Sequence, residues 1–137
     1  MTERRLRRRP GENREYLLEA GLVEFGLSGY HGTATARIAT RAGVPQPHVY
    51  ASFRTKQELF LACVEASADR VRGSEANADD ELLILQAVAA AQTPDLSGPL
   101  REILSALRHS VGDVAFHALL ARAARSMLAP SAPEAAL

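Results

Sequence analysis

The chain has 137 residues, of which 47% are hydrophobic and 5% aromatic, with no Trp and with 16 Lys and Arg matching 16 Asp and Glu. Abundant Ala and Leu without long β-branched runs favour an all-α protein. The sequence contains no apolar run of about 18 residues, the length that a membrane-spanning helix needs. The single cysteine, Cys63, excludes an internal disulfide and a multi-cysteine metal site, and the lack of a signal peptide predicts a soluble, cytoplasmic protein.

Charge is distributed unevenly along the chain. Residues 1–72 carry 12 Lys and Arg against 8 Asp and Glu, whereas residues 73–137 carry 4 against 8. This asymmetry indicates that only the first half approaches a polyanion. Residues 2–11 form an arginine-rich arm with two open interpretations: its side chains contact phosphates or a minor groove, or they form a solvated tail. Its arginines are Arg4, Arg5, Arg7, Arg8 and Arg9.

The spacing of apolar residues predicts four helices in the first half of the chain. They span residues 13–27, 34–42, 45–53 and 55–72. Gly29 is expected to end the first helix in a left-handed conformation, and Thr33 to act as the N-cap of the second. Thr55 and Glu58 follow the Thr-x-x-Glu pattern of a capping box, which predicts the start of the long fourth helix.

The second and third helices are joined by Ala42, Gly43 and Val44, a tight turn centred on glycine. Two short helices joined in this way are typical of a helix-turn-helix, whose second helix enters the major groove of DNA. Pro45 and Pro47 are compatible with this assignment, because the first N–H groups of a helix have no internal partner. The side chains left exposed on the third helix can meet base edges, thymine methyl groups or phosphates. They are Gln46, Pro47, His48, Tyr50, Ala51 and Ser52.

The second half begins with a polar linker, residues 73–77, followed by three predicted helices. These helices span residues 80–92, 99–110 and 113–128. Apolar residues make a stripe on each of the last two, and we expect a second copy of the chain to cover both stripes in a two-fold four-helix arrangement. The stripes consist of Leu100, Ile103, Leu104 and Leu107, and of Val114, Leu119, Leu120, Met127 and Leu128.

A set of residues at characteristic spacings resembles the DNA-binding domain of the tetracycline-repressor (TetR) family over about Arg14 to Ser67. The set comprises Phe25, Gly29, Tyr30, Thr33, Ile38, Ala39, Ala42, Gly43, Val44, Tyr50, Phe53, Lys56, Glu58 and Leu59. The resemblance implies two domains: the arm and helix-turn-helix in residues 1–54, and the connecting helix with a short helical dimerisation and ligand-binding region in residues 55–137. The second half is shorter than in relatives, so either a reduced dimerising domain or a segment missing near residues 73–81 accounts for it.

The resemblance also implies roles for individual residues. Base contacts are expected at Gln46, Pro47 and His48, and backbone contacts at Tyr50, Ser52 and Lys56. From the second helix, Thr35 would approach a phosphate, and Arg37 is a further candidate for DNA contact. By analogy with the family, a pocket for a small apolar effector would lie in the second half. Its lining would be Leu85, Val88, Ala89, Phe116 and Leu120.

No catalytic set, cofactor motif or metal-ligand spacing is recognisable, so we expect neither an enzyme nor a cofactor. Cys63 is interpreted as a small buried hydrophobe rather than a redox sensor, and His109 and His117 as ordinary helix residues rather than ligands. The predicted function is a homodimeric, sequence-specific regulator of transcription, a repressor released from operator DNA by a small molecule and associated with the nucleoid when bound. The alternative is a helical interaction module that keeps this fold without binding DNA; the polar face of the third helix and the basic first half argue against it.

Overall fold

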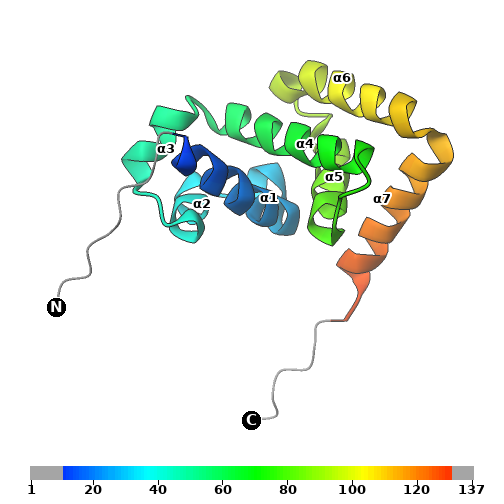
Figure 1. Ribbon diagram of the computed structural model, residues 1–137, viewed down its shortest axis with the longest axis horizontal. Coiled ribbons are helices and arrows are strands. Elements are labelled where there is room, and N and C mark those ends of the chain that lie inside the picture. Colours follow the sequence, from blue (N-terminus) through cyan, green and yellow to red (C-terminus); the bar gives the residue numbers. More distant parts are fainter. Residues whose placement is uncertain (1–10, 131–137) are drawn as a thin grey trace, which may run out of the picture.

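A computed structural model describes residues 11–130 of the chain, so the arginine-rich arm lies outside the described residues. Seven helices make up this part, which confirms the predicted all-α class (Figure 1). They are α1 (Glu12–Gly32), α2 (Thr35–Ala42), α3 (Gln46–Ser52), α4 (Lys56–Arg72), α5 (Ala78–Ala90), α6 (Pro94–Val111) and α7 (Asp113–Leu128).

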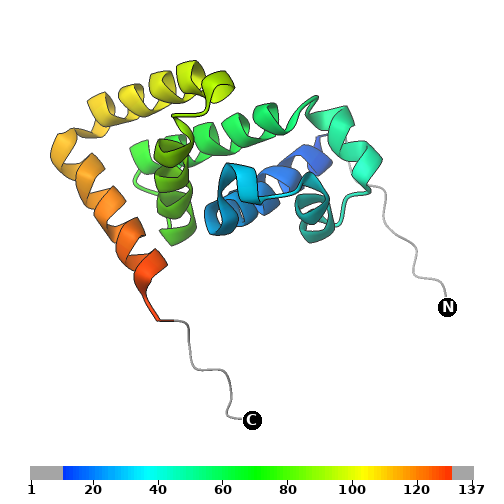
Figure 2. The same cartoon turned by 180° about the vertical axis from the view of Figure 1, so that it is seen from behind.

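The long helices α1 and α4 run side by side, with α2 and α3 at one end of the pair and α5 crossing the other (Figures 1 and 2). Helix α6 lies along α4, and α7 returns to pack against α5. One hydrophobic core continues from the first four helices into the last three. Its largest fully buried side chains include Phe25, Phe60, Leu59, Leu83, Leu96 and Leu107. The division between residues 1–54 and 55–137 therefore stays a prediction.

Helix α1 continues past its predicted end, with an interruption at Gly29, where φ is 77° and ψ is 173°. Glycine suits this position because residues that carry a side chain rarely adopt a positive φ. The predicted cap at Thr33 is wrong: its hydroxyl donates to the carbonyl oxygens of Gly29 at 2.7 Å and Glu24 at 3.1 Å. Thr33 thus satisfies the C-terminal end of α1, and Ala34 precedes α2 without a side-chain cap.

The predicted start of α4 is confirmed. Thr55 Oγ1 accepts a hydrogen bond from the backbone N–H of Glu58 at 3.0 Å. The Glu58 carboxylate in turn accepts a hydrogen bond from the backbone N–H of Arg54 at 2.6 Å. Arg54 is the residue immediately before the N-cap. A full capping box occurs at the start of α5, between Asn77 and Asp80, and places the start of this helix two residues before its predicted position.

The second half differs from prediction in α6, which begins at Pro94 rather than Pro99. Proline fits the first turn, whereas Pro99 inside the helix leaves the Asp95 carbonyl without its helical donor. Leu100, Leu104 and Leu107 are buried within the chain, since α6 packs on α4 and α5. The expectation that α6 needs a second copy to cover its stripe is therefore wrong for these three leucines.

Helix α7 buries some of its apolar residues and leaves others exposed. Phe116 and Leu119 are buried, and α7 packs against α5 and α6. Val114 and Leu128 are 86% and 84% exposed, and Met127 is exposed as well. An apolar surface therefore remains open on α7 after the chain has folded.

Candidate nucleic-acid interface

The turn between α2 and α3 has the geometry that its sequence predicts. Gly43 adopts φ 67° and ψ 31°, and its N–H donates to the Thr40 carbonyl at 3.2 Å. The N–H of Val44 donates to the Ala39 carbonyl at 3.0 Å, and the Val44 side chain is buried. These two bonds close the end of α2 and fix the direction in which α3 leaves.

Helix α3 is held by a small number of buried contacts and is otherwise open to solvent. Val49 and the following Phe53 are buried, with the Arg14 guanidinium 5.1 Å above the Phe53 ring. Pro45 precedes the helix, Pro47 lies in its first turn, and neither removes a bond that the helix could make. The predicted base-contacting residues Gln46, Pro47 and His48 are all exposed on this anchored helix, as is Tyr50.

Three of the predicted site residues meet across α2 and α3. The Tyr50 hydroxyl lies 3.3 Å from Thr35 Oγ1, and Gln46 Nε2 donates to the same oxygen at 3.5 Å. The group brings together one amide and two hydroxyls on a surface that water reaches. Such groups can exchange these weak internal bonds for bonds to base edges and phosphate oxygens.

Lys56 is the first residue of α4. Its Nζ is 4.6 Å from the centre of the Tyr30 ring, and burial lowers the pKa of its ammonium group. The Tyr30 ring in turn packs edge-on against Phe60, with centroids 5.0 Å apart. A cation over an aromatic face is attracted by the ring quadrupole, so Tyr30 restricts where the Lys56 charge can be. Sequence reasoning included Tyr30 only in the family resemblance and missed this contact.

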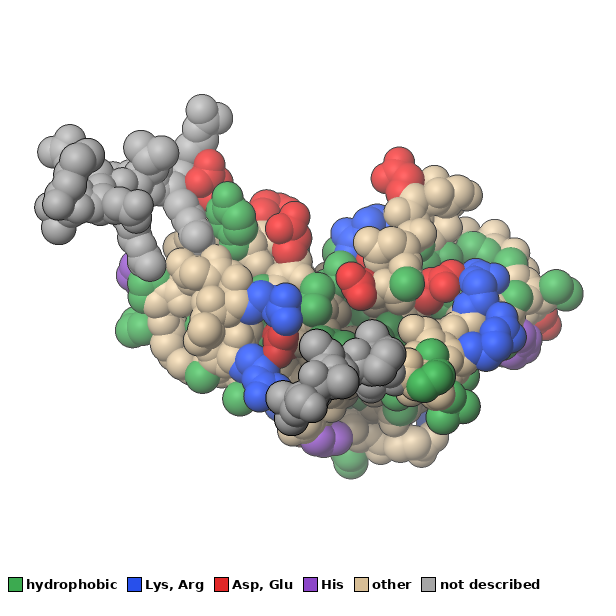
Figure 3. Space-filling model, turned by 90° about the horizontal axis from the view of Figure 1, so that it is seen from below, with side chains coloured by type: hydrophobic (Ala, Val, Ile, Leu, Met, Phe, Trp, Pro, Cys, Tyr) green, Lys and Arg blue, Asp and Glu red, His purple; other side chains and the backbone are tan. Residues whose placement is uncertain are grey.

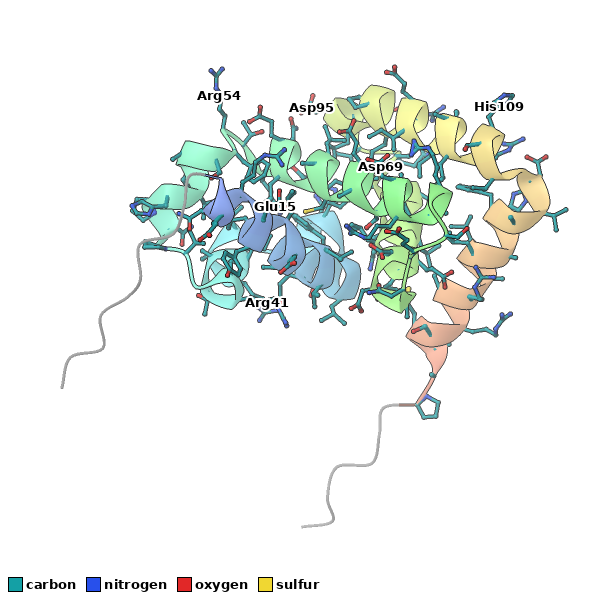
Figure 4. The ribbon with its side chains drawn as sticks, in the orientation of Figure 1. Glu15, Arg41, Arg54, Asp69, Asp95 and His109 are labelled. Atoms are coloured by element: carbon teal, nitrogen blue, oxygen red, sulfur yellow. The ribbon has the colours of Figure 1, made fainter. Side chains whose placement is uncertain are left out.

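The α2 arginines are arranged differently from the rest of the predicted site. Arg41 Nε donates to Glu24 Oε2 at 2.6 Å, and Arg37 Nε lies 3.7 Å from Glu24 Oε1. The Glu24 side chain is only 7% exposed, whereas that of Arg37 is 65% exposed. Figure 4 shows Arg41 directed away from α3, and Figure 3 shows basic side chains on both sides of an acidic one on the lower face.

Glu24 was missed by the sequence analysis, although a signal was present. It directly precedes Phe25 in an otherwise inward-facing part of α1, and a carboxylate there needs a partner. The partners of the Glu24 carboxylate are Arg37 and Arg41 of α2. The remaining predicted residue, Ser52, lies half-buried in the last turn of α3.

The five predicted pocket residues have unequal environments. Phe116 is buried, Leu85 and Leu120 are half-buried, and Val88 and Ala89 are exposed. The last two therefore open to solvent instead of facing an enclosed space. A groove of about 620 Å³ lies elsewhere, between α4 and α6, with Leu61 and Ile103 in its lining.

Other features bear on the remaining expectations. Within residues 11–130, no helix is long and apolar enough to cross a bilayer, and no cluster of three His, Cys, Asp or Glu side chains could hold a metal ion. Cys63 is buried, and this burial raises the pKa of its thiol to about 12. His109 and His117 are exposed on helix surfaces.

Comparison with known proteins identifies the domain that carries α3. Residues 17–63 match the family model of bacterial regulatory proteins of the tetR family. Residues 17–63 form a domain of the tetR type. The TetR match covers α2, the turn and α3 in full, together with most of α1 and the first part of α4.

Two curated regulators resemble this TetR domain. YdgC of Bacillus subtilis, an uncharacterized HTH-type transcriptional regulator, is 34% identical over 61 residues, which are 44% of this chain and 31% of YdgC. FasR of Mycolicibacterium smegmatis, an HTH-type transcriptional activator, is 41% identical over 60 residues, which are 44% of this chain and 27% of FasR. The matches thus span no more than about a third of either relative.

A solved structure extends the likeness beyond the first domain. A protein from Mesorhizobium loti MAFF303099 assigned to the TetR family superposes with a TM-score of 0.60 at 22% sequence identity. The superposition covers 89% of this chain and 71% of the other. At this identity the comparison shows a shared fold, including helices of the second half.

Proposed function

We propose that this chain regulates transcription by reading duplex DNA with α3. The observation that carries the proposal is the exposed polar face of a helix that the core holds in place. Val49 and Phe53 anchor α3, while the side chains of Gln46, His48 and Tyr50 are exposed to solvent. This arrangement suits insertion into a major groove, where side chains near the start of a recognition helix reach base edges.

The environments of the individual residues support a division of labour. Gln46 and His48, in the first turn of α3, would contact bases, and Pro47 a thymine methyl group. Tyr50, Ser52, Thr35 and Lys56 would contact the phosphate backbone, which positions the protein without reading sequence. Arg37 would reach a phosphate only by leaving Glu24, so we assign it a smaller contribution.

We propose further that the working form is a homodimer whose interface includes the outer face of α7. The exposed Val114, Met127 and Leu128 support this, whereas the buried leucines of α6 contribute from inside the chain. A two-fold dimer would place two copies of α3 in successive major grooves, about 34–36 Å apart. The operator would then carry two half-sites with that spacing.

The proposal extends to the direction of regulation and to the release of the protein from DNA. We favour a repressor, whereas the relative FasR is an activator. An effector pocket at Leu85, Phe116 and Leu120 would need the second protomer to close it, because Val88 and Ala89 are exposed. Contacts between the α5–α6 connection and α1 support communication: Thr93 Oγ1 lies 3.1 Å from His31 Nε2.

Selection from a random duplex library with the full chain tests the proposal. We expect enrichment of one motif, bound at least about a thousandfold more tightly than a scrambled duplex at physiological salt. The double variant Q46A/H48A should keep its helical circular dichroism and lose the preference. Failure to bind any duplex, even at low salt, would contradict the proposal and favour an interaction module.

A further inference from the structure

A side chain of α5 lies across the interruption near the end of α1. In an uninterrupted helix, the Gly26 carbonyl would accept a hydrogen bond from the N–H of Tyr30, four residues later. Gly29, with φ 77° and ψ 173°, lies between these two residues and departs from helical geometry. Helix α5 packs against α1 (Figure 2), and its Gln86 Nε2 donates to the Gly26 carbonyl at 3.0 Å. The interrupted part of α1 therefore receives a hydrogen bond from the second half of the chain.

The Gln86 amide also lies close against Gly29. Its Oε1 would be 3.1 Å from a Cβ added to Gly29, which is tighter than an ordinary van der Waals contact. On the other side of the interruption, Thr33 Oγ1 donates to the Gly29 carbonyl at 2.7 Å. Backbone acceptors away from water need such donors. The carbonyls of Gly26 and Gly29 thus both have side-chain donors, and the donor to Gly26 belongs to α5.

The residue that follows Gly29 carries the ring that contacts Lys56. The Tyr30 ring stacks on Phe25 with centroids 6.3 Å apart and meets Phe60 edge-on at 5.0 Å. Lys56 Nζ lies 4.6 Å from the centre of the same ring. Because Tyr30 directly follows Gly29, the backbone direction at Gly29 determines where the ring starts. A different backbone geometry at Gly29 would therefore move the ring relative to the ammonium group.

We propose that Gln86 is a positioning residue for Lys56. Its bond to the Gly26 carbonyl and its contact with Gly29 hold the interruption of α1 in one geometry, and this geometry places the Tyr30 ring against the ammonium group. Gln86 is half-buried and acts on Lys56 through Tyr30. The tetR-type domain match ends at residue 63, so a residue outside the matched domain sets the position of a charge inside it.

This positioning has a consequence for DNA that rests on the proposed function. Lys56 is proposed to contact a phosphate, and a cation that is already held in place loses less conformational freedom when it binds. Without the Gln86 bond, the ammonium group would be less restrained and the phosphate contact weaker. Since phosphates carry no base sequence, the loss would be similar for every duplex. Gln86 thereby contributes to affinity and leaves the base preference to α3.

The positioning is tested without DNA by NMR, because Lys56 is the only lysine in the chain. Isotope-labelled lysine gives a single ε-methylene signal, and the face of an aromatic ring shifts nearby protons upfield. In the full parent chain we expect an upfield signal, which Y30L moves to the position of an unshielded lysine. Q86M keeps the length of the side chain and Q86E its shape, but both remove the donor, so both should move the signal most of the way to its Y30L position. Q92M replaces an exposed glutamine after α5 and should leave the signal unchanged.

Three results would overturn the positioning. One is a Lys56 signal that Y30L moves and both Gln86 variants leave in place. Another is an equal shift in Q92M, which would indicate a general effect of the second half. The third needs no variant: the parent chain must show nuclear Overhauser effects from the Gln86 side-chain amide to the α-protons of Gly29, and from the Tyr30 ring to the Lys56 ε-protons. The absence of either effect would contradict the contacts on which the proposal depends.

Anisotropy titrations test the consequence for DNA. Q86M should weaken binding to the selected motif and to a random duplex by the same factor, about two- to fivefold, whereas Q92M should bind as the parent does. In a K56A background, Q86M should have no further effect. A loss that persists in K56A would mean that Gln86 acts on another contact. If the parent bound no duplex, the proposed function would fail, while the NMR result would still decide whether Gln86 positions Lys56.

Discussion

Gln46 and Lys56 have different surroundings. Gln46 is exposed on the first turn of α3 and makes a single weak bond to Thr35. Lys56 is half-buried against Tyr30 at the start of α4. Neither side chain belongs to the core that holds α3, so substitutions at these two positions test the proposed roles in base reading and phosphate binding without disturbing that core.

We predict that Q46A costs roughly 1–3 kcal/mol of binding free energy, confined to one base position of the operator. K56A should weaken binding to all duplexes by similar factors and reduce the salt slope by about one charge. Anisotropy titrations on matched and mismatched duplexes at several salt concentrations measure both. If Q46A acted uniformly while K56A changed the base preference, the assignment of the two roles would be reversed.

Cys63 shows how packing determines reactivity. Its Sγ would lie 2.7 Å from a Cβ added to Gly21, so α1 approaches α4 closely enough to enclose the thiol. Burial raises the pKa of the thiol to about 12, and the nearby Arg70 and Arg14 only partly oppose this. The reactive thiolate is therefore scarce at neutral pH.

The expected outcome is that iodoacetamide modifies Cys63 very slowly in the folded protein at pH 8. Urea should accelerate the reaction in step with unfolding, since the unfolded thiol regains a pKa of about 8.5. Mass spectrometry of quenched samples gives the rates. Rapid modification without denaturant would contradict the burial of the thiol and would reopen a redox role.

At the scale of elements, α4 and α5 are joined by a buried polar cluster around Asp80. Its Oδ1 accepts from Ser67 Oγ at 2.7 Å and from Arg70 Nε at 2.8 Å, and its Oδ2 accepts from the Asn77 N–H at 3.0 Å. Burial alone would raise the pKa of Asp80; the bonds from Arg70, Asn77 and Ser67 outweigh it and leave the pKa below its ordinary value.

A carboxyl group with a lowered folded-state pKa stabilises the protein above its unfolded pKa, near 3.9, and loses this contribution as the pH falls through the folded pKa. D80N should therefore lower the free energy of unfolding by roughly 2–4 kcal/mol at pH 7, a value reduced for the partial exposure of Arg70. The difference from the parent protein should shrink below about pH 4. Urea unfolding at pH 7 and pH 3 measures it, with D79N as the exposed control.

The elements predicted best are those with local signals. Gly43 sets the turn, and Thr55 with Glu58 starts α4, because each acts through bonds to its own backbone neighbours. The errors arose where the decisive partner is distant in sequence. Thr33 bonds back to α1, and the leucines of α6 are covered by α4 and α5, neither of which can be read from spacing.

In the candidate site, too, local spacing predicts some features, whereas partners distant in sequence determine others. The exposure of Gln46, Pro47 and His48 follows from the period of a short helix with Val49 inside. The positions of Lys56 and Arg37 depend on Tyr30 and Glu24, which belong to another helix. Sequence therefore predicted which face of α3 is presented, but not which neighbours restrain the charges around it.

At the scale of the whole molecule, α7 carries the apolar side chains through which we propose that the chain dimerises. Val114 and Leu128 are the most exposed of its large apolar side chains. We predict a dimer at micromolar concentration that V114E/L128E converts to monomer, with little change in thermal unfolding of the monomer itself. Sedimentation velocity measures the assembly. A monomeric parent chain, or a dimer that survives both charges, would place the interface elsewhere.

Tyr30 connects regions of the molecule that are distant in sequence. One face of its ring carries Lys56, while burial and the charge of Asp95 raise the pKa of its hydroxyl, which places the first turn of α6 close by. The adjacent His31 contacts Thr93 immediately before that turn. Displacement of the first turn of α6 can thus shift the position of the Lys56 ammonium through one side chain, Tyr30. This connection between α6 and Lys56 passes through the Tyr30 ring alone and requires no bending of a helix.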